Sequence, residues 1–119
     1  MTRSRSFALA APALLAGLAV AAPAFGKATP LAATVGPGFT ITVKKAGARV
    51  TTLKRGAYTI SVNDRSDFHN FRLRGPGLNR ATGVAFVGRR TWTVTLRPGR
   101  YAFLCDPHSL DMRGSIRVT

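Results

Sequence analysis

A chain of 119 residues has room for one domain. Its 18 lysines and arginines against four acidic residues give a formal net charge of +14, and its single cysteine excludes any disulfide within the chain. With four carboxylates, two histidines and one cysteine, the sequence shows neither paired carboxylates nor a nucleophile–base set, so we expect a protein that is not an enzyme.

The high positive charge has several interpretations. Such a field would steer an acidic partner protein toward the molecule, or hold the molecule loosely near an anionic cell envelope. Nucleic acid is a further polyanionic partner, but the basic residues are scattered rather than clustered, and the export signal described next argues against it. A solvated basic surface without a steering role, reflecting an arginine-rich genome, is the remaining alternative.

The first 26 residues have the pattern of a signal peptide. Two arginines precede an apolar run over residues 7–22, and small residues surround the position where a signal peptidase would cut. We predict cleavage after Gly26, with Ala24 as the alternative, and therefore a periplasmic or extracellular protein. An uncleaved membrane anchor is the competing interpretation, because residues 7–25 are about long enough to span a bilayer.

Strand patterns begin after a segment of different composition. Residues 27–38 are rich in Ala, Thr, Pro and Gly and are predicted to be a flexible lead-in to a domain over residues 39–119. From Phe39 to Val43 apolar residues alternate with threonines, the period of two that is typical of a strand. Residues 50–53 predict a short extended segment, and residues 58–62 repeat the clear alternation.

Further strand patterns follow in the second half of the chain. In D-F-H-N-F, His69 shares its parity with the next aromatic residue, so a strand here would point the imidazole into the core. The remaining strands are predicted at residues 84–87, 92–96, 101–105 and 115–118. No segment after residue 26 has convincing helical periodicity. Short strands separated by Gly/Pro turns predict an all-β, antiparallel sandwich.

The segment Y-A-F-L-C-D-P-H-S-L-D-M-R-G holds three side chains of types that bind copper: Cys105, His108 and Met112. Thiolate and thioether suit Cu(I), imidazole also suits Cu(II), and two histidines with a cysteine and a weak axial methionine form a blue-copper site. The second imidazole has one source, His69. A lone cysteine in an exported protein indicates an intermolecular bridge, a reactive thiol or a metal ligand.

Each of these residues alone has an ordinary structural explanation. A histidine on an apolar strand face is more often a hydrogen-bonded core residue than a ligand. A buried cysteine usually acts as a small hydrophobic residue, and a methionine as core filler. The copper hypothesis rests on their combination, since three of the four candidate donors lie on one short loop and the fourth faces inward in the same domain.

The motif Y-A-F-L-C-D-P-H followed by M-R-G-S-I-R-V resembles the copper loop of the cupredoxins, the family of plastocyanin, amicyanin and pseudoazurin. F-H-N-F resembles the upstream His-Asn of that family, and the resemblance covers residues 39–119. It implies a Greek-key β-sandwich with one type 1 copper per chain at one end. The ligands that it implies, strong ones first and the weak axial one last, are His69, Cys105, His108 and Met112.

The same resemblance and the loop itself suggest supporting roles. Asn70 matches the family's asparagine and would help to pin the ligand loop, and Pro107 keeps the cysteine and the second histidine on one tight turn. His108 should expose its ring edge and pass electrons to a partner. Pro107, Leu110 and Phe68 would form an apolar rim for docking that partner.

The sequence therefore predicts an exported, monomeric blue copper protein that carries single electrons between redox partners. Two alternatives stay open. The same four residues could serve copper storage, delivery or buffering in the envelope, or the domain could be a structural or adhesion module that binds no metal.

Overall fold

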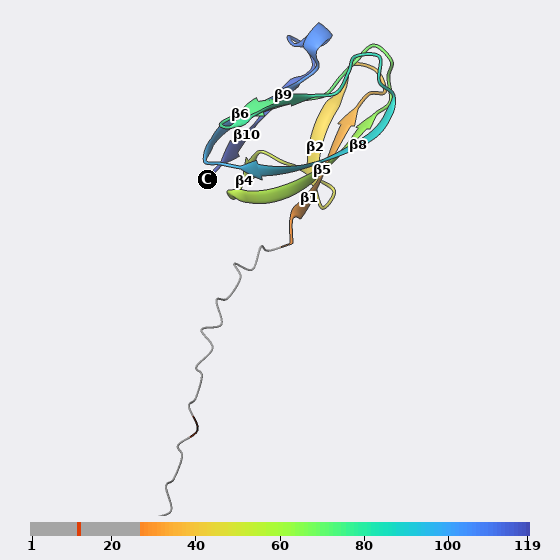
Figure 1. The fold of residues 1–119 in the computed structure, drawn as a ribbon. Coiled ribbons are helices and arrows are strands. Elements are labelled where there is room, and N and C mark those ends of the chain that lie inside the picture. Colours follow the sequence, from red (N-terminus) through yellow and green to blue (C-terminus); the bar gives the residue numbers. More distant parts are fainter. Residues whose placement is uncertain (1–11, 13–26) are drawn as a thin grey trace, which may run out of the picture.

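The computed structural model describes residues 12 and 27–119, and the latter form two β-sheets packed face to face (Figure 1). The first sheet contains β1 (Thr29–Val35), β2 (Ile41–Lys45), β3 (Ala48–Arg49), β5 (Gly56–Asp64) and β8 (Gly88–Leu96). The second contains β4 (Thr52–Leu53), β6 (Arg72–Gly75), β7 (Leu78–Ala81), β9 (Gly99–Leu104) and β10 (Arg113–Val118). Strand orders are β3-β2-β1-β5-β8 and β4-β10-β9-β6-β7, so the chain crosses repeatedly between the sheets. The predicted all-β sandwich is confirmed.

The signal peptide predicted over residues 1–26 lies outside the described residues, apart from Pro12. In the part of the chain that the structure describes, no helix is long and apolar enough to cross a membrane. The helical element of this part is one 3₁₀ turn, η1 (Asp106–His108), which agrees with the lack of helical periodicity.

The predicted flexible lead-in over residues 27–38 is wrong for most of its length, because β1 lies in the middle of the first sheet. Leu31, Ala33 and Val35 alternate along it and are buried, with 3%, 0% and 0% of their surface exposed. The alternation is weak in the sequence because alanines and threonines make up most of this segment. A turn at Gly36-Pro37-Gly38 then reverses the chain into β2, and both glycines have positive φ values of 71° and 66° that favour glycine.

The sandwich is mixed rather than purely antiparallel. β1 pairs with β5 in parallel, as does β4 with β10, while the other pairs are antiparallel. Parallel neighbours need a long connection. For β1 and β5 that connection is the intervening run of β2, β3 and β4.

Two predicted strands begin or lie elsewhere. Residues 84–87 form a loop, because Val84 and Val87 are exposed and have no sheet to pack on, whereas β7 comes earlier as the hairpin partner of β6. The strand expected from His69 starts at Arg72. The histidine nevertheless is fully buried, as its parity predicts.

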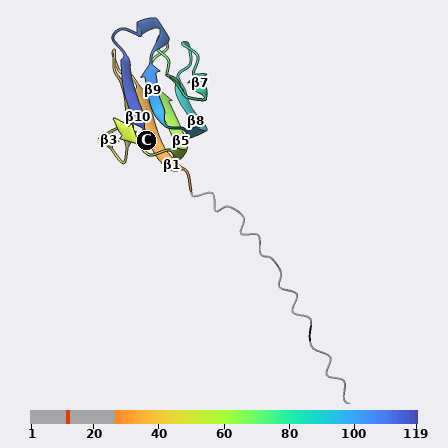
Figure 2. The ribbon, with the colours of Figure 1, turned by 90° about the vertical axis from the view of Figure 1, so that its left-hand side faces the viewer.

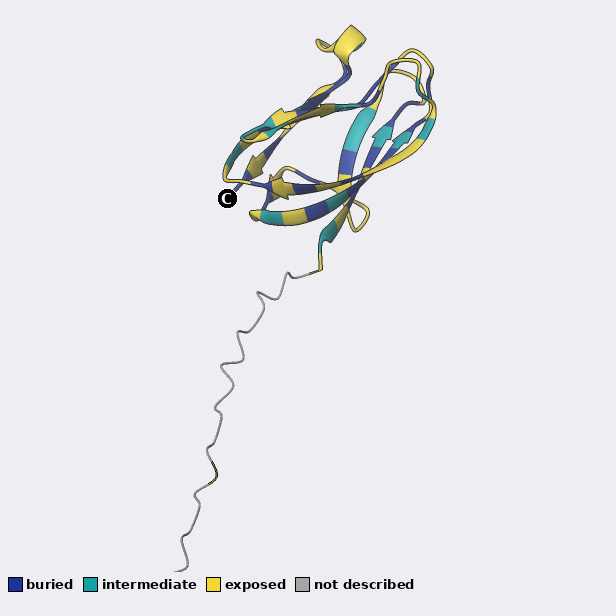
Figure 3. Ribbon diagram, viewed as in Figure 1, coloured by how far each residue is buried: buried dark blue, intermediate teal, exposed yellow. Residues whose placement is uncertain are grey.

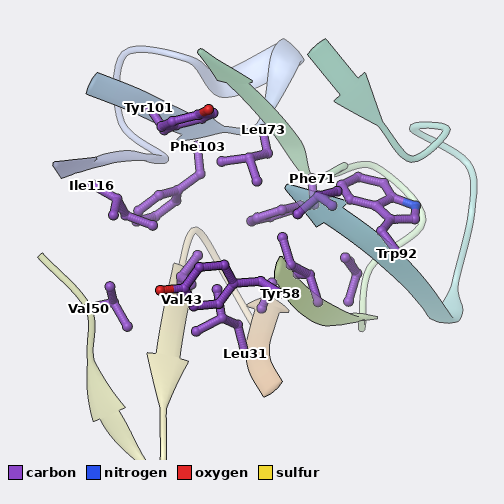
Figure 4. Packing of buried hydrophobic residues seen from close by; sticks show 14 of the residues in the cluster. Leu31, Val43, Val50, Tyr58, Phe71, Leu73, Trp92, Tyr101, Phe103 and Ile116 are labelled. Atoms are coloured by element: carbon purple, nitrogen blue, oxygen red, sulfur yellow. The ribbon is translucent and has the colours of Figure 1, made fainter. Parts of the chain in front are cut away.

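Side chains from both sheets meet in one apolar core (Figure 4), and Figure 3 marks buried residues on the strands of both sheets. The alternating residues of β8 point inward as predicted, and Trp92 packs on Phe71 with ring centroids 5.9 Å apart. Phe71 also stacks on Phe103 of β9 at 6.3 Å. Because Phe71 follows the segment of His69, this packing fixes that segment on the second sheet.

Tyr101 anchors the start of β9 away from the ends that carry the candidate ligands. Its buried hydroxyl donates to the carbonyl of Pro76 at 2.6 Å and accepts the backbone N–H of Arg97 at 3.0 Å. Its ring lies against Gly75, where a Cβ atom would come within 2.4 Å of the ring. The phenol therefore joins β9 to the turn after β6 and to the end of β8.

We expect Tyr101→Phe to lower the free energy of unfolding by about 1 kcal/mol, because it removes two partly buried hydrogen bonds, one to the Pro76 carbonyl and one from the Arg97 N–H. Urea unfolding with linear extrapolation measures this. Arg97→Ala keeps the backbone N–H and is the matched control, expected to stay within about 0.5 kcal/mol. Equal effects of the two variants would contradict the role of the hydroxyl.

Candidate metal centre

Three segments far apart in the sequence meet at one end of the sandwich. They are the turn between β1 and β2, the segment before β6, and the loop from β9 through η1 to β10, which is seen at the top of Figure 2. The second segment carries His69 and the third carries Cys105 and His108. His69 and Cys105 are fully buried, while His108 is half-buried and so reaches the surface.

The structure brings these three side chains together. The Nδ1 atoms of His69 and His108 are 3.1 Å apart, and the Sγ atom of Cys105 lies 3.6 Å and 3.7 Å from them. Donors bound to one ion at the bond lengths of zinc, with angles between tetrahedral and trigonal, lie about 3.4–3.8 Å apart. Both sulfur–nitrogen distances fall in this range, and the nitrogen–nitrogen distance is slightly shorter. The three residues therefore fit a single metal ion.

The tautomer of His69 supports the same conclusion. Its Nε2 atom lies 2.9 Å from the carbonyl oxygen of Gly38. A carbonyl can only accept, so Nε2 carries the proton and Nδ1 directs a lone pair toward the thiol and the other imidazole. Metal-binding histidines typically donate their second N–H in this way. Gly38 has no motif to mark it in the sequence, and only the folded turn shows its role.

Asn70 locks the two ligand-bearing segments together. Its Oδ1 accepts the backbone N–H of Asp106 at 2.7 Å, and its Nδ2 donates to the Asp106 carboxylate at 2.8 Å and to the carbonyl of Thr82 at 3.1 Å. Its backbone N–H points at the sulfur of Cys105, with a separation of 3.5 Å. The expectation that Asn70 pins the ligand loop agrees with these contacts.

The ligand loop is also closed by its own backbone. Cys105 N–H donates to the carbonyl of Met112 at 3.0 Å, and Met112 N–H donates to that of His108 at 2.8 Å. Pro107 stands at the start of the 3₁₀ turn and is exposed, so it shapes the loop from outside. The Met112 side chain is fully buried in the core cluster. The structure thus places Met112 at the end of the ligand loop, and axial ligation by its sulfur stays a prediction.

An ion pair at the surface holds Asp106 in place. Arg72 donates from Nε and from a terminal nitrogen to the two carboxylate oxygens, at 2.7 Å and 2.9 Å. The hydrogen bond from Arg72, followed by that from Asn70, lowers the pKa of Asp106 below its ordinary value. Arg72 alternates with apolar residues like any exposed strand residue, so sequence reasoning did not identify it.

Two exposed aromatic rings border the imidazoles. Phe39 lies edge-on to His108 and His69, with centroids 5.0 Å and 5.3 Å away, and Phe68 lies 4.1 Å from His69. Phe39 is 60% exposed and precedes β2, so the strand predicted from Phe39 begins only at Ile41. Leu110, on the same loop as His108, is 86% exposed, which agrees with an apolar rim.

Comparison with solved structures identifies the fold. No protein-family model matches the sequence, and no curated protein matches it significantly. Rusticyanin in its reduced form superimposes with a TM-score of 0.57, 22% identity and coverage of 79% of this chain and 81% of that one. Further rusticyanin structures, one described as a copper protein and one from Thiobacillus ferrooxidans, give TM-scores of 0.57 and 0.56 at 20% and 22% identity, covering 79% of both chains. The chain has the cupredoxin fold.

The sequence resemblance to the cupredoxins is thereby confirmed in fold, and the His-Cys-His cluster lies where that resemblance places a copper site. The sandwich begins before residue 39, where the domain was predicted to start, because β1 is part of its first sheet. At 20–22% identity this similarity shows the fold alone, so the chemistry of the site follows from the residues of this chain.

We expect Asn70→Ala to weaken metal binding by about 10–100-fold, because it releases the ligand loop. Competition titration with a chelator measures the affinity. Asn79→Ala is the matched control, since Asn79 is exposed and accepts a hydrogen bond from Nη1 of Arg72 at 2.7 Å, so it probes the neighbouring Arg72–Asp106 pair and not the Asn70 amide. If Asn70→Ala keeps its metal affinity and its fold by circular dichroism, the Asn70 side chain does not hold the ligand loop as described.

We expect Arg72→Gln to lower the free energy of unfolding of the metal-free protein by about 0.5–1 kcal/mol at pH 7, as is usual for a partly exposed pair. The pKa of Asp106 is lower folded than unfolded, so its stabilisation is present above the unfolded value and is lost as pH falls through the folded one. The two proteins should therefore converge in urea unfolding once the pH has fallen below the folded pKa of Asp106. A constant difference at all pH values would contradict this linkage.

Proposed function

We propose that this chain binds one copper ion through His69, Cys105 and His108 and carries single electrons. The observation that carries the proposal is the convergence of the two Nδ1 atoms and the thiol, with His69 held as an Nε2–H tautomer. Two imidazoles with one thiolate are the strong ligands of a blue-copper centre. A bound copper ion would supply a one-electron change between Cu(I) and Cu(II).

The framework around the ligands suits electron transfer because it resists movement. β9 and β10 hold both ends of the ligand loop in one antiparallel pair, from Leu104 opposite Arg113 to Gly99 opposite Val118. Asn70 ties the loop to the segment of His69, and Gly38 holds the imidazole from the other side. Ligands that keep their positions in both oxidation states minimise the energy of reorganisation. We expect Met112 to be the weak axial ligand that tunes the reduction potential.

His108 is the natural exit for electrons, because it alone of the three is partly exposed. Phe39, Phe68 and Leu110 surround it with exposed apolar surface, which suits short-lived docking of a redox partner. Rusticyanin, which has the same fold, is a copper protein known in a reduced form, and this supports a redox role here.

The remaining parts of the proposal concern the setting of the protein. We infer that it acts after export, as a monomer, in the periplasm or outside the cell, and that it catalyses no reaction itself. Full burial of His69 and Cys105 argues for a carrier rather than for copper delivery, since an acceptor protein would have to reach those ligands to remove the ion.

Addition of Cu(II) to the purified metal-free protein tests the site. We expect one copper per chain and an intense blue colour, because a thiolate bound to Cu(II) absorbs visible light strongly. Cys105→Ser should lose the colour, whereas Met112→Leu should keep it and shift the reduction potential. A colourless complex of the wild-type protein, or a blue Cys105→Ser variant, would overturn the proposal.

Voltammetry then separates a carrier from a delivery protein. A reversible one-electron wave with rapid self-exchange supports electron transfer. Transfer of Cu(I) to a chelating acceptor protein, without a reversible wave, would support copper delivery instead.

A further inference from the structure

The end of the sandwich opposite the metal centre is lined by basic side chains. Two open grooves adjoin there and share Arg55 and Thr119. The basic residues that line them are Lys27, Lys45, Lys54, Arg55, Arg100 and Arg117. We call this surface the distal basic end. Among its lining residues no aspartate or glutamate occurs.

The four acidic side chains of the sequence all belong to the other end. Asp64 ends β5 beside the turn after β1, and Asp67 lies two residues before His69. Asp106 and Asp111 belong to the ligand loop. Carboxylates therefore offset part of the basic charge near the metal centre but none of it at the distal basic end, so the molecule has a strong charge asymmetry along the strands.

The two ends are too far apart to share a partner. The nine residues of β5 run from Gly56 at the distal basic end to Asp64 at the metal end. At about 3.3 Å per residue this is roughly 26–30 Å. A redox protein docked at the distal basic end would thus lie far from His108, so the charge there needs another explanation than electron exchange.

The surface lacks the features of a stable protein–protein interface. The exposed large apolar side chains of the described residues are Phe39, Phe68, Val84, Val87 and Leu110, and none of them lines the two grooves. Interfaces between proteins usually contain aromatic or aliphatic anchors at their centres. A basic surface without such anchors matches a layer of anionic headgroups better.

The path of the chain favours a lipid surface in particular. Lys27 and Thr29, at the start of the described fold, line the first groove at the distal basic end (Figure 1), and the sequence has 26 residues before them. Those residues include the apolar run over 7–22. Basic residues directly beside an apolar segment are the arrangement by which proteins recognise anionic lipids. If the apolar segment is retained, its insertion and the electrostatic attraction of the basic residues both contribute to membrane binding. If it is cleaved, electrostatic attraction alone remains.

We propose that the distal basic end binds the anionic headgroups of a lipid bilayer and thereby presents the metal centre away from the membrane. Binding needs no metal. One consequence of this binding does rest on the proposed function: His108 and its apolar rim stay open to soluble partners.

Partition of the full chain into lipid vesicles tests this. The readout is the ratio of partition into phosphatidylglycerol-containing vesicles to partition into pure phosphatidylcholine vesicles, which removes any contribution of the apolar segment. One triple variant removes charge from the distal basic end: Lys45→Gln, Lys54→Gln and Arg117→Gln. These residues are exposed, and their side chains form no hydrogen bond within the described residues. We expect a loss of about fivefold for each side chain, hence about two orders of magnitude, and a similar loss in high salt.

The matched control removes the same charge from the metal end. Arg65→Gln, Arg89→Gln and Arg113→Gln are exposed and lie beside Val35, Asn63 and Leu104. This control variant should keep most of the preference for phosphatidylglycerol-containing vesicles over pure phosphatidylcholine vesicles. An equal loss in both triple variants would mean that net charge alone acts, and no loss in the distal variant would mean that these residues do not bind lipid. Either result overturns the proposal. Cys105→Ser should partition like the wild type, so failure of copper binding leaves this test intact.

Discussion

The side chain of Asn70 joins the two segments that carry the candidate ligands, and the geometry of the site depends on it. One amide meets the backbone and carboxylate of Asp106, while the neighbouring backbone N–H reaches the sulfur of Cys105. Because Asn70 is 1% exposed, its hydrogen bonds cannot be replaced by bulk water. Burying a polar group of this kind is favourable only if every partner is in place, so the clamp selects one arrangement of the loop.

The clamp depends in turn on the sandwich. Phe71 follows Asn70 and packs between Trp92 and Phe103, and its N–H donates to the hydroxyl of Thr82 at 2.9 Å. Packing of the core and the position of the ligands are therefore coupled through two adjacent residues. This coupling explains how a site at the very end of a small domain can be rigid although one of its imidazoles reaches solvent.

The two ends of the molecule are specialised in different ways. The metal end has buried donors, exposed aromatic rings and all four acidic side chains, whereas the distal end has basic side chains without apolar anchors. Parallel and antiparallel strands that span the whole domain keep these surfaces apart. Under the two proposals, one end would engage a soluble partner while the other meets a charged surface, and neither contact would block the other.

The sequence by itself determined the β-class and the candidate metal-binding residues, because alternation reports which side chains face inward and the residues that can bind copper are few. His69, Asn70, Cys105 and His108 could be identified for that reason. Tertiary structure alone decided the rest. β1 enters the core through small residues whose alternation is weak, and the roles of Gly38, Arg72 and Phe39 arise from contacts between segments more than thirty residues apart. Local patterns carry no information about such contacts, since chain folding creates the distances that define them.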